Sequence, residues 1–118
     1  MALILVVDDE YLVAIMLADV LEDEGFEVVT ASNGQLALDA IEVRRPDLVV
    51  TDFMMPAMTG LELAEALRAD AETAQVPILL VSGAQGGIAR SRPDLFDAVL
   101  DKPYQTNAMI AQIRALLN

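Results

Sequence analysis

Histidine, cysteine and tryptophan are all absent from this chain of 118 residues, and each absence narrows the range of possible functions. Without histidine, neither a histidine-based metal site nor a catalytic triad with a histidine general base can form. Without cysteine, no disulfide framework holds the fold together, and the redox compartment stays undetermined. No apolar run reaches the length that crosses a bilayer, so we expect no membrane insertion.

Basic residues are also scarce, because 7 Lys and Arg stand against 19 Asp and Glu, for a formal net charge of −12. Phosphate backbones repel such a surface, so we expect no direct binding to nucleic acid. Hydrophobic residues make up 55% of the chain, which is enough for one packed domain over residues 1–118. The chain starts with an apolar run and lacks a basic leader, so we expect a cytoplasmic protein.

Short apolar runs alternate with helical patterns along the whole chain. The predicted strands cover residues 3–7, 26–30, 48–51, 78–81 and 98–100. The predicted helices cover residues 10–24, 33–44, 59–69, 88–91 and 105–117, with Gly25 as the stop of the first. This alternation predicts an α/β fold, in which a doubly wound parallel sheet carries helices on both faces. The second strand alternates polar and apolar residues, which suits an edge of the sheet.

Charged residues directly follow three of the predicted strands. Asp8 and Asp9 end the first apolar run, Asp52 ends the run at 48–51, and Lys102 follows the last run. Because ligands of open α/β sheets bind at the carboxyl ends of the strands, we expect these side chains to converge in one crevice. Three carboxylates and one ammonium group in a crevice indicate a divalent cation and a phosphoryl group.

Four separated motifs, in this order, resemble the receiver domain of two-component response regulators. They are Asp8-Asp9, the stretch from Asp52 through Pro56 to Gly60, Ser82, and Lys102-Pro103. The resemblance covers essentially the whole chain and implies a flavodoxin-like sheet of five strands in the order 2-1-3-4-5. It also implies a phosphohistidine donor, on a histidine kinase or a histidine phosphotransfer protein, and a downstream protein partner whose binding changes on phosphorylation.

The residue types support the roles that the resemblance implies. Phosphoryl transfer needs an in-line nucleophile and positive charge that stabilises the equatorial oxygens. Asp52 is the candidate nucleophile and phosphoacceptor. Lys102 would neutralise the phosphoryl oxygens as a compact point charge, and the Ser82 hydroxyl would donate a hydrogen bond to them.

The same carboxylates are candidate metal ligands. Asp8, Asp9 and Asp52 offer hard oxygen atoms, which suit Mg²⁺. The resemblance adds the backbone carbonyl of Met54 as a further ligand. Three carboxylates this close should repel one another without metal, which predicts a raised pKa for at least one of them.

Three other function classes fit the residues less well. An aspartyl-phosphate phosphatase of the haloacid dehalogenase type needs a second Asp two residues after the nucleophile, where this chain has Met54. We therefore predict no turnover enzyme, apart from hydrolysis of the chain's own phosphoryl group. A pseudo-receiver that acts without phosphorylation is disfavoured because the complete set of site residues is present. A flavin binder would need aromatic residues and a phosphate-cradling loop, whereas this chain has no Trp, only two Tyr and no such loop.

The first predicted helix carries more apolar residues than one stripe needs. Its predicted core-facing stripe consists of Val13, Met16, Leu17, Val20 and Leu21. Leu12 and Ile15 lie outside the stripe and leave two interpretations open. They form either a broad core contact or a docking patch for the helical bundle of the phosphodonor.

The sequence says least about how the protein would pass a signal on to its partner. Val99 stands three residues before Lys102, where many receivers have a Tyr or Phe that turns inward on phosphorylation, so that aromatic switch is not expected here. No recognisable output segment follows the last predicted helix, which favours a stand-alone regulator. A receiver module cut from a hybrid histidine kinase or a larger regulator is the alternative.

Overall fold

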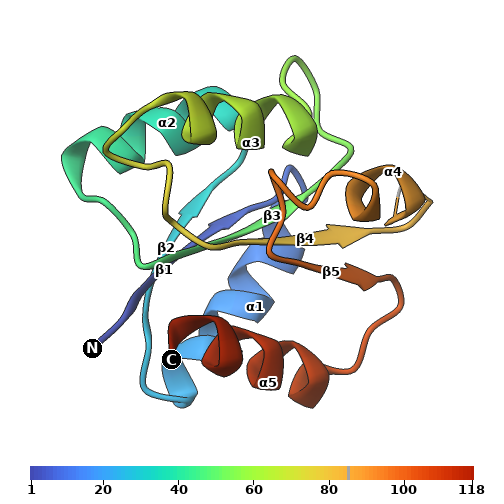
Figure 1. The fold of residues 1–118 in the computed structure, drawn as a ribbon. Helices are drawn as coiled ribbons and strands as arrows, with labels where there is room; N and C mark the ends of the chain where they lie inside the picture. Colours follow the sequence, from blue (N-terminus) through green and yellow to red (C-terminus); the bar gives the residue numbers. More distant parts are fainter. Residues whose placement is uncertain (85) are drawn as a thin grey trace.

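The computed structural model describes residues 1–84 and 86–118, and it shows a parallel sheet between two layers of helices (Figure 1). The strands in chain order are β1 (Leu3–Val7), β2 (Glu27–Ala31), β3 (Leu48–Asp52), β4 (Ile78–Ser82) and β5 (Ala98–Asp101). They lie in the order β2-β1-β3-β4-β5, and every neighbouring pair is parallel. The predicted flavodoxin-like order is therefore confirmed, and so is the edge position of the second strand.

Helices cover both faces of the sheet, as the alternation predicts. The helices are α1 (Tyr11–Asp23), α2 (Gly34–Val43), α3 (Gly60–Ala69), α4 (Gly86–Arg90) and α5 (Thr106–Leu117). Figure 1 shows α1 and α5 on one face, with α2, α3 and α4 on the other. Each face has its own hydrophobic core, because the side chains of every buried strand alternate between the two faces. In the part of the chain that the structure describes, no helix is long and apolar enough to cross a membrane.

Local sequence signals fix the ends of several helices. The Asn33 side chain accepts a hydrogen bond from the backbone N–H of Leu36 at 2.8 Å and so caps α2. Thr59 and Glu62 form a reciprocal capping box at the start of α3. Gly25 has a φ of 95°, a conformation that favours glycine, and ends the α1 segment as predicted.

Some details of the predicted elements are wrong by small amounts, among them the fourth helix, which spans Gly86–Arg90 and not residues 88–91. The second strand begins at Glu27 because the backbone N–H of Phe26 donates to the carbonyl of Leu21 and so closes the end of α1. In α1, Met16 is 68% exposed, whereas Ala14 is buried. The two residues lie about 200° apart around the helix, so the face that meets the sheet is the one with Ala14 and Leu21.

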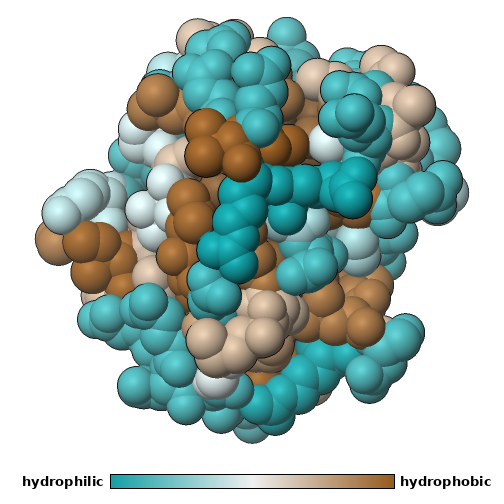
Figure 2. Space-filling view, turned by 90° about the vertical axis from the view of Figure 1, so that its left-hand side faces the viewer, coloured by the Kyte–Doolittle hydropathy of each residue, from teal (hydrophilic) through white to brown (hydrophobic). Residues whose placement is uncertain are grey.

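Figure 1 places both chain ends on the side of the molecule where the strands begin. Figure 2 views this side, where hydrophobic residues reach the surface between hydrophilic ones. An apolar pocket of about 300 Å³ is lined there by residues of β1, β2 and α2, including Leu3, Val29 and Ile41. The lining residue Arg44 is already paired with Glu27 at 2.8 Å, so the pocket offers little polar chemistry.

A largely buried guanidinium ties together the loops on the α3 side of the sheet. Nη1 of Arg68 donates to the carbonyls of Ala74 and Val76, at 3.0 and 2.6 Å. Nη2 donates to the carbonyl of Leu95 at 2.9 Å and to Oδ2 of Asp97 at 2.8 Å. The same Asp97 oxygen accepts from the backbone N–H of Ile78, so the starts of β4 and β5 are fixed together.

We expect Arg68→Met to lower the free energy of unfolding by about 2–3 kcal/mol, because it leaves several buried acceptors and the Asp97 carboxylate without their donor. Urea unfolding followed by circular dichroism measures this change. Arg92→Met is the matched control, since it breaks an exposed Arg–Asp pair within one loop and should leave stability almost unchanged. Equal effects of the two substitutions would contradict the role assigned to Arg68.

Candidate functional site

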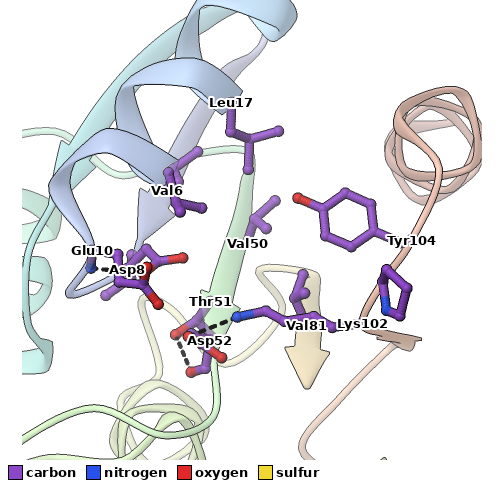
Figure 3. Close-up of a pocket in the computed structure, with 13 residues that line it drawn as sticks. Val6, Asp8, Glu10, Leu17, Val50, Thr51, Asp52, Val81, Lys102 and Tyr104 are labelled. Atoms are coloured by element: carbon purple, nitrogen blue, oxygen red, sulfur yellow. Dashed lines mark hydrogen bonds and ion pairs between the residues drawn. The ribbon is translucent and has the colours of Figure 1, made fainter. Parts of the chain in front are cut away.

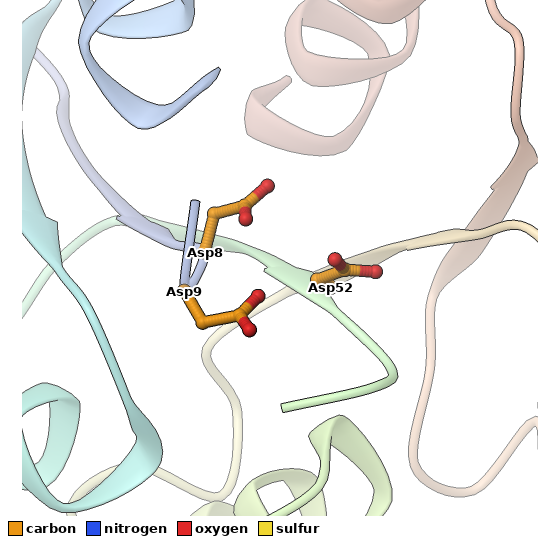
Figure 4. A group of neighbouring side chains, drawn as sticks. All are labelled: Asp8, Asp9 and Asp52. Atoms are coloured by element: carbon orange, nitrogen blue, oxygen red, sulfur yellow. The ribbon is translucent and has the colours of Figure 1, made fainter. Parts of the chain in front are cut away.

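Three carboxylates meet at the edge of the sheet where β1 and β3 end (Figure 4). Parallel pairing places Val7 opposite Thr51, so Asp8 and Asp52 follow one rung of the ladder. One oxygen from each of Asp8, Asp9 and Asp52 lies within 4.8 Å of the other two. Asp8 and Asp52 are only 8% and 9% exposed, whereas Asp9 is open to solvent. The structure thus brings together the carboxylates that the strand-end pattern singles out.

Lys102 approaches this cluster from the segment after β5. Its Nζ donates to Oδ2 of Asp52 at 3.1 Å, and the peptide bond between Lys102 and Pro103 is cis. Partial burial acts to lower the pKa of Lys102, but the hydrogen bond and negative charge of Asp52 outweigh it, so this pKa lies above its ordinary value of 10.5. Lys102 is therefore fully charged at neutral pH.

The backbone after β3 holds Asp52 in a fixed orientation. Oδ1 of Asp52 accepts a hydrogen bond from the backbone N–H of Phe53 at 2.9 Å, while Oδ2 accepts from Lys102. The backbone N–H of Gly60 donates to the carbonyl of Phe53 at 2.8 Å. A Cβ atom at Gly60 would collide with the carbonyl oxygen of Asp52, so this close approach requires glycine.

Asp8 has a raised pKa, mainly because burial disfavours its charged form. A hydrogen bond from the backbone N–H of Glu10 to Oδ1 of Asp8, at 2.9 Å, acts in the opposite direction. The charge of Asp52 raises the pKa further, Lys102 lowers it, and Asp9 makes a small raising contribution. The predicted raised pKa is therefore present, although burial contributes more to it than carboxylate repulsion does.

Ser82 lies at a strand end, as the sequence predicts, and Met54 lies in the loop after β3. Ser82 is the last residue of β4 and is fully buried, one residue beyond Val81, which pairs with Asp52. The backbone N–H of Lys102 donates to the carbonyl of Ser82 at 2.8 Å. Met54 follows Asp52 by two residues, with an exposed side chain. The hydroxyl donor role of Ser82 and the carbonyl ligand role of Met54 remain predictions.

A pocket of about 520 Å³ opens beside these groups (Figure 3). Asp8, Asp52 and Lys102 line its polar part, and the apolar side chains of Val50 and Leu17 line the rest. Figure 3 shows the Tyr104 hydroxyl pointing toward Val50 and Leu17. Burial raises the pKa of Tyr104, against the opposing charge of Lys102, so the phenol stays protonated.

The chemistry of the cluster fits a hard divalent cation. All three side chains offer carboxylate oxygens, which Mg²⁺ prefers to nitrogen or sulfur. Oxygen atoms on opposite sides of Mg²⁺ are about 4.2 Å apart. The three carboxylate oxygens lie within 4.8 Å of one another, so they would move closer together to hold one such ion.

An open parallel sheet that gathers acidic residues and one lysine at its carboxyl edge is the arrangement that the resemblance to receiver domains implies. The profile of the response regulator receiver domain matches residues 4–114, and the chain belongs to this family. This match confirms the resemblance drawn from the four motifs. Receiver domains are signalling modules of two-component systems.

Two relatives at the sequence level illustrate the kind of protein that this chain resembles. The phosphate regulon transcriptional regulatory protein PhoB of Rhizobium meliloti is 35% identical over 116 residues, covering 97% of this chain and 51% of the relative. The DNA-binding response regulator MtrA of Mycobacterium tuberculosis is 36% identical over 124 residues, covering 97% of this chain and 50% of the relative. The chain thus spans about half the length of the curated relatives that it matches.

Solved structures of receivers share the fold over the full length of the chain. The chemotaxis protein CheY4 of Vibrio cholerae superposes with a TM-score of 0.92 at 29% identity, covering 99% of both chains. The receiver domain of a signal transduction histidine kinase from Syntrophus aciditrophicus gives a TM-score of 0.91 at 27% identity, covering 99% of this chain and 90% of the other.

The buried carboxyl of Asp8 predicts a pH dependence of stability in the absence of metal. Its folded pKa lies above the ordinary value of 3.8, so its stabilising contribution is complete below the unfolded pKa and is lost as pH rises through the folded pKa. As the pH rises through this range, the parent chain should lose the stability that protonated Asp8 gives it. Asp8→Asn has no carboxyl group at this position to ionise, so we expect its stability to increase relative to that of the parent.

Urea unfolding between about pH 3 and pH 7 measures the difference between parent and variant. Asp19→Asn, which changes an exposed carboxylate on α1, is the control and should follow the parent. A parent–Asp8→Asn difference that does not change with pH would contradict the burial argument.

Proposed function

We propose that this chain is a phosphorylation-controlled switch in which Asp52 accepts a phosphoryl group from a phosphohistidine. The donor would be a histidine kinase or a histidine phosphotransfer protein. The observation that carries the proposal is the 3.1 Å contact between Nζ of Lys102 and Oδ2 of Asp52, inside a cluster of three carboxylates. A lysine held on a buried carboxylate, beside carboxylates that suit a metal ion, fits phosphoryl transfer to that carboxylate.

Each residue of the site has its own role in the proposed phosphoryl transfer. An oxygen of Asp52 forms a bond to phosphorus while the bond from phosphorus to the donor's imidazole nitrogen breaks, and the electron pair stays on that nitrogen. The backbone N–H of Phe53 orients the carboxylate for this attack. Lys102 then pairs with the phosphoryl oxygens in place of Asp52, and the Ser82 hydroxyl donates a hydrogen bond to the same group.

The proposed cofactor is Mg²⁺, held by the side chains of Asp8, Asp9 and Asp52 and by the backbone carbonyl of Met54. Bound Mg²⁺ would supply positive charge against the oxygens of the phosphoryl group. The three-carboxylate geometry supports this assignment, because it offers hard oxygen donors from two adjacent strands.

The exposed part of α1 is the proposed contact for the phosphodonor. Leu12 is 71% exposed, so the interpretation of it as a broad core contact is wrong. Tyr11, Met16 and Ile15 also expose side-chain surface on this helix. Helix α1 begins two residues after Asp9, so this apolar surface lies beside the acidic site and suits the helical bundle of a phosphodonor.

The proposed output is a change in affinity for a downstream protein partner. One relative is named a transcriptional regulatory protein and another a DNA-binding response regulator, but the chain matches only about half of each. The charge of −12 on this chain disfavours direct binding to nucleic acid. We propose signalling without enzymatic turnover, in the cytoplasm. The stand-alone form and the module of a larger regulator are both compatible with this role.

Binding of Mg²⁺ should stabilise the folded chain, because the carboxylate cluster forms only on folding. At one hundred times the dissociation constant, the gain is about 2.7 kcal/mol, or roughly a 10 °C rise in Tm. Thermal melts with and without millimolar Mg²⁺ measure this rise. Asp9→Asn should lose most of it, whereas Asp19→Asn should keep it; a parent melt that does not respond to Mg²⁺ would contradict the metal assignment.

Phosphorylation itself is tested by intact mass after incubation with a small phosphodonor, such as acetyl phosphate. We expect one phosphoryl adduct on the parent chain in the presence of Mg²⁺, and none after chelation. Asp52→Asn should give no adduct, and Asp19→Asn should behave like the parent. An adduct that survives Asp52→Asn would show that the nucleophile is a different residue.

Absence of an adduct from a small phosphodonor would be followed by the same assay with a phosphorylated histidine phosphotransfer protein. A parent chain that stays unmodified with both donors would favour the phosphorylation-independent pseudo-receiver.

A further inference from the structure

An ion pair with two hydrogen bonds joins α4 to β5. Nη1 and Nη2 of Arg90 donate to Oδ1 and Oδ2 of Asp101, at 3.2 and 2.7 Å. A bidentate contact of this kind fixes the relative orientation of the two groups, which a single hydrogen bond does not. Arg90 is the last residue of α4, and Asp101 is the last residue of β5.

The Asp101 carboxylate also lies against the other end of α4. A Cβ atom at Gly86, the first residue of this helix, would collide with Oδ1 of Asp101. It would also come within 2.7 Å of Nη1 of Arg90. The same ion pair therefore contacts both ends of the helix, and the missing side chain at Gly86 makes room for it.

Helix α4 depends strongly on such contacts. It has 5 residues, and a helix of this length is not stable by itself in water. Gly86 and Ala89 are its buried residues, so its apolar anchor is small. Among the residues that the structure describes, no second ion pair links α4 to a strand.

Asp101 connects this ion pair to the phosphorylation site. In the ladder between β4 and β5, Asp101 pairs with Ser82. The next residue, Lys102, donates its backbone N–H to the carbonyl of Ser82 at 2.8 Å and its Nζ to Asp52 at 3.1 Å. A shift of the backbone at Asp101 therefore moves the two groups that would bind a phosphoryl group.

We propose that the Arg90–Asp101 ion pair is a latch between α4 and the phosphorylation site, with Asp101 as a positioning residue for Ser82 and Lys102. This proposal takes the identity of the ligand at the site, a phosphoryl group, from the proposed function. In the unphosphorylated chain the pair holds α4 against β5. Movement of Ser82 and Lys102 toward a phosphoryl group pulls on Asp101 and releases the helix. Because such coupling is reciprocal, release of α4 must strengthen phosphoryl binding by the same factor.

Amide hydrogen exchange on the whole chain, without any ligand, tests the latch directly. Arg90→Gln and Asp101→Asn each remove the ion pair with little change of shape. We expect each to speed exchange about twofold to fivefold, both in residues 86–90 and at the amide of Lys102. The double variant should exchange no faster than either single variant, because the second substitution removes nothing further.

Arg92→Gln is the matched control, since the side chain of Arg92 pairs with Asp94 at 3.0 Å within one loop and not with a residue of a strand. It should leave the exchange of Lys102 unchanged. Arg90→Lys keeps the charge and should recover part of the parent behaviour. Unchanged exchange at Lys102 in Arg90→Gln and Asp101→Asn would overturn the proposal.

Affinity for beryllium fluoride with Mg²⁺, a stand-in for the phosphoryl group, separates a latch from a merely structural contact. A latch predicts about twofold to fivefold tighter binding in Arg90→Gln than in the parent, whereas a structural role predicts equal or weaker binding, which would overturn the proposal. Failure of the parent to bind beryllium fluoride would contradict the proposed function, and the exchange comparison would still decide whether the latch exists.

Discussion

Parallel pairing of β1 with β3 is the constraint on which the whole site depends. Because parallel strands run in one direction, the residues that follow them emerge at one edge of the sheet. The pairing of Val7 with Thr51 brings Asp8 beside Asp52, although the two are far apart in the chain. A slip of one residue would turn Asp52 to the other face of the sheet. The fully buried strands fix the register, so the hydrophobic core sets the geometry of the acidic site.

The negative charges gathered at this edge of the sheet lower the stability of the fold. Asp8 and Asp52 are buried beside each other. Burial is the largest of the effects that disfavour the charged form of Asp8. Lys102 offsets part of this cost through its contact with Asp52. Functional sites commonly reduce stability in this way, because the groups that bind a ligand tightly are poorly satisfied without it.

Sequence alone predicts the layers, the strand order and the gathering of the three carboxylates. The layers and the gathering of the carboxylates follow from hydrophobic periodicity and from strand direction, whereas the strand order follows from the resemblance to receiver domains. The exposed position of Met16 was not predictable, because α1 has apolar residues on more than one side. The contacts of Arg68 with Asp97, and of Arg90 with Asp101, join residues that are distant in sequence. Such contacts depend on how helices and loops pack, which no local pattern records.

Both chain ends lie on the side of the molecule where the strands begin, whereas the carboxylates lie where the strands end. A polypeptide joined to either end therefore leaves from the side opposite the acidic pocket. The fold can therefore be joined to different neighbouring domains without obstruction of the carboxylate site. It is consistent with the variety of known receivers, which occur in regulators about twice this length and in a histidine kinase. The geometry of one sheet thus separates where the module is attached from where it reacts.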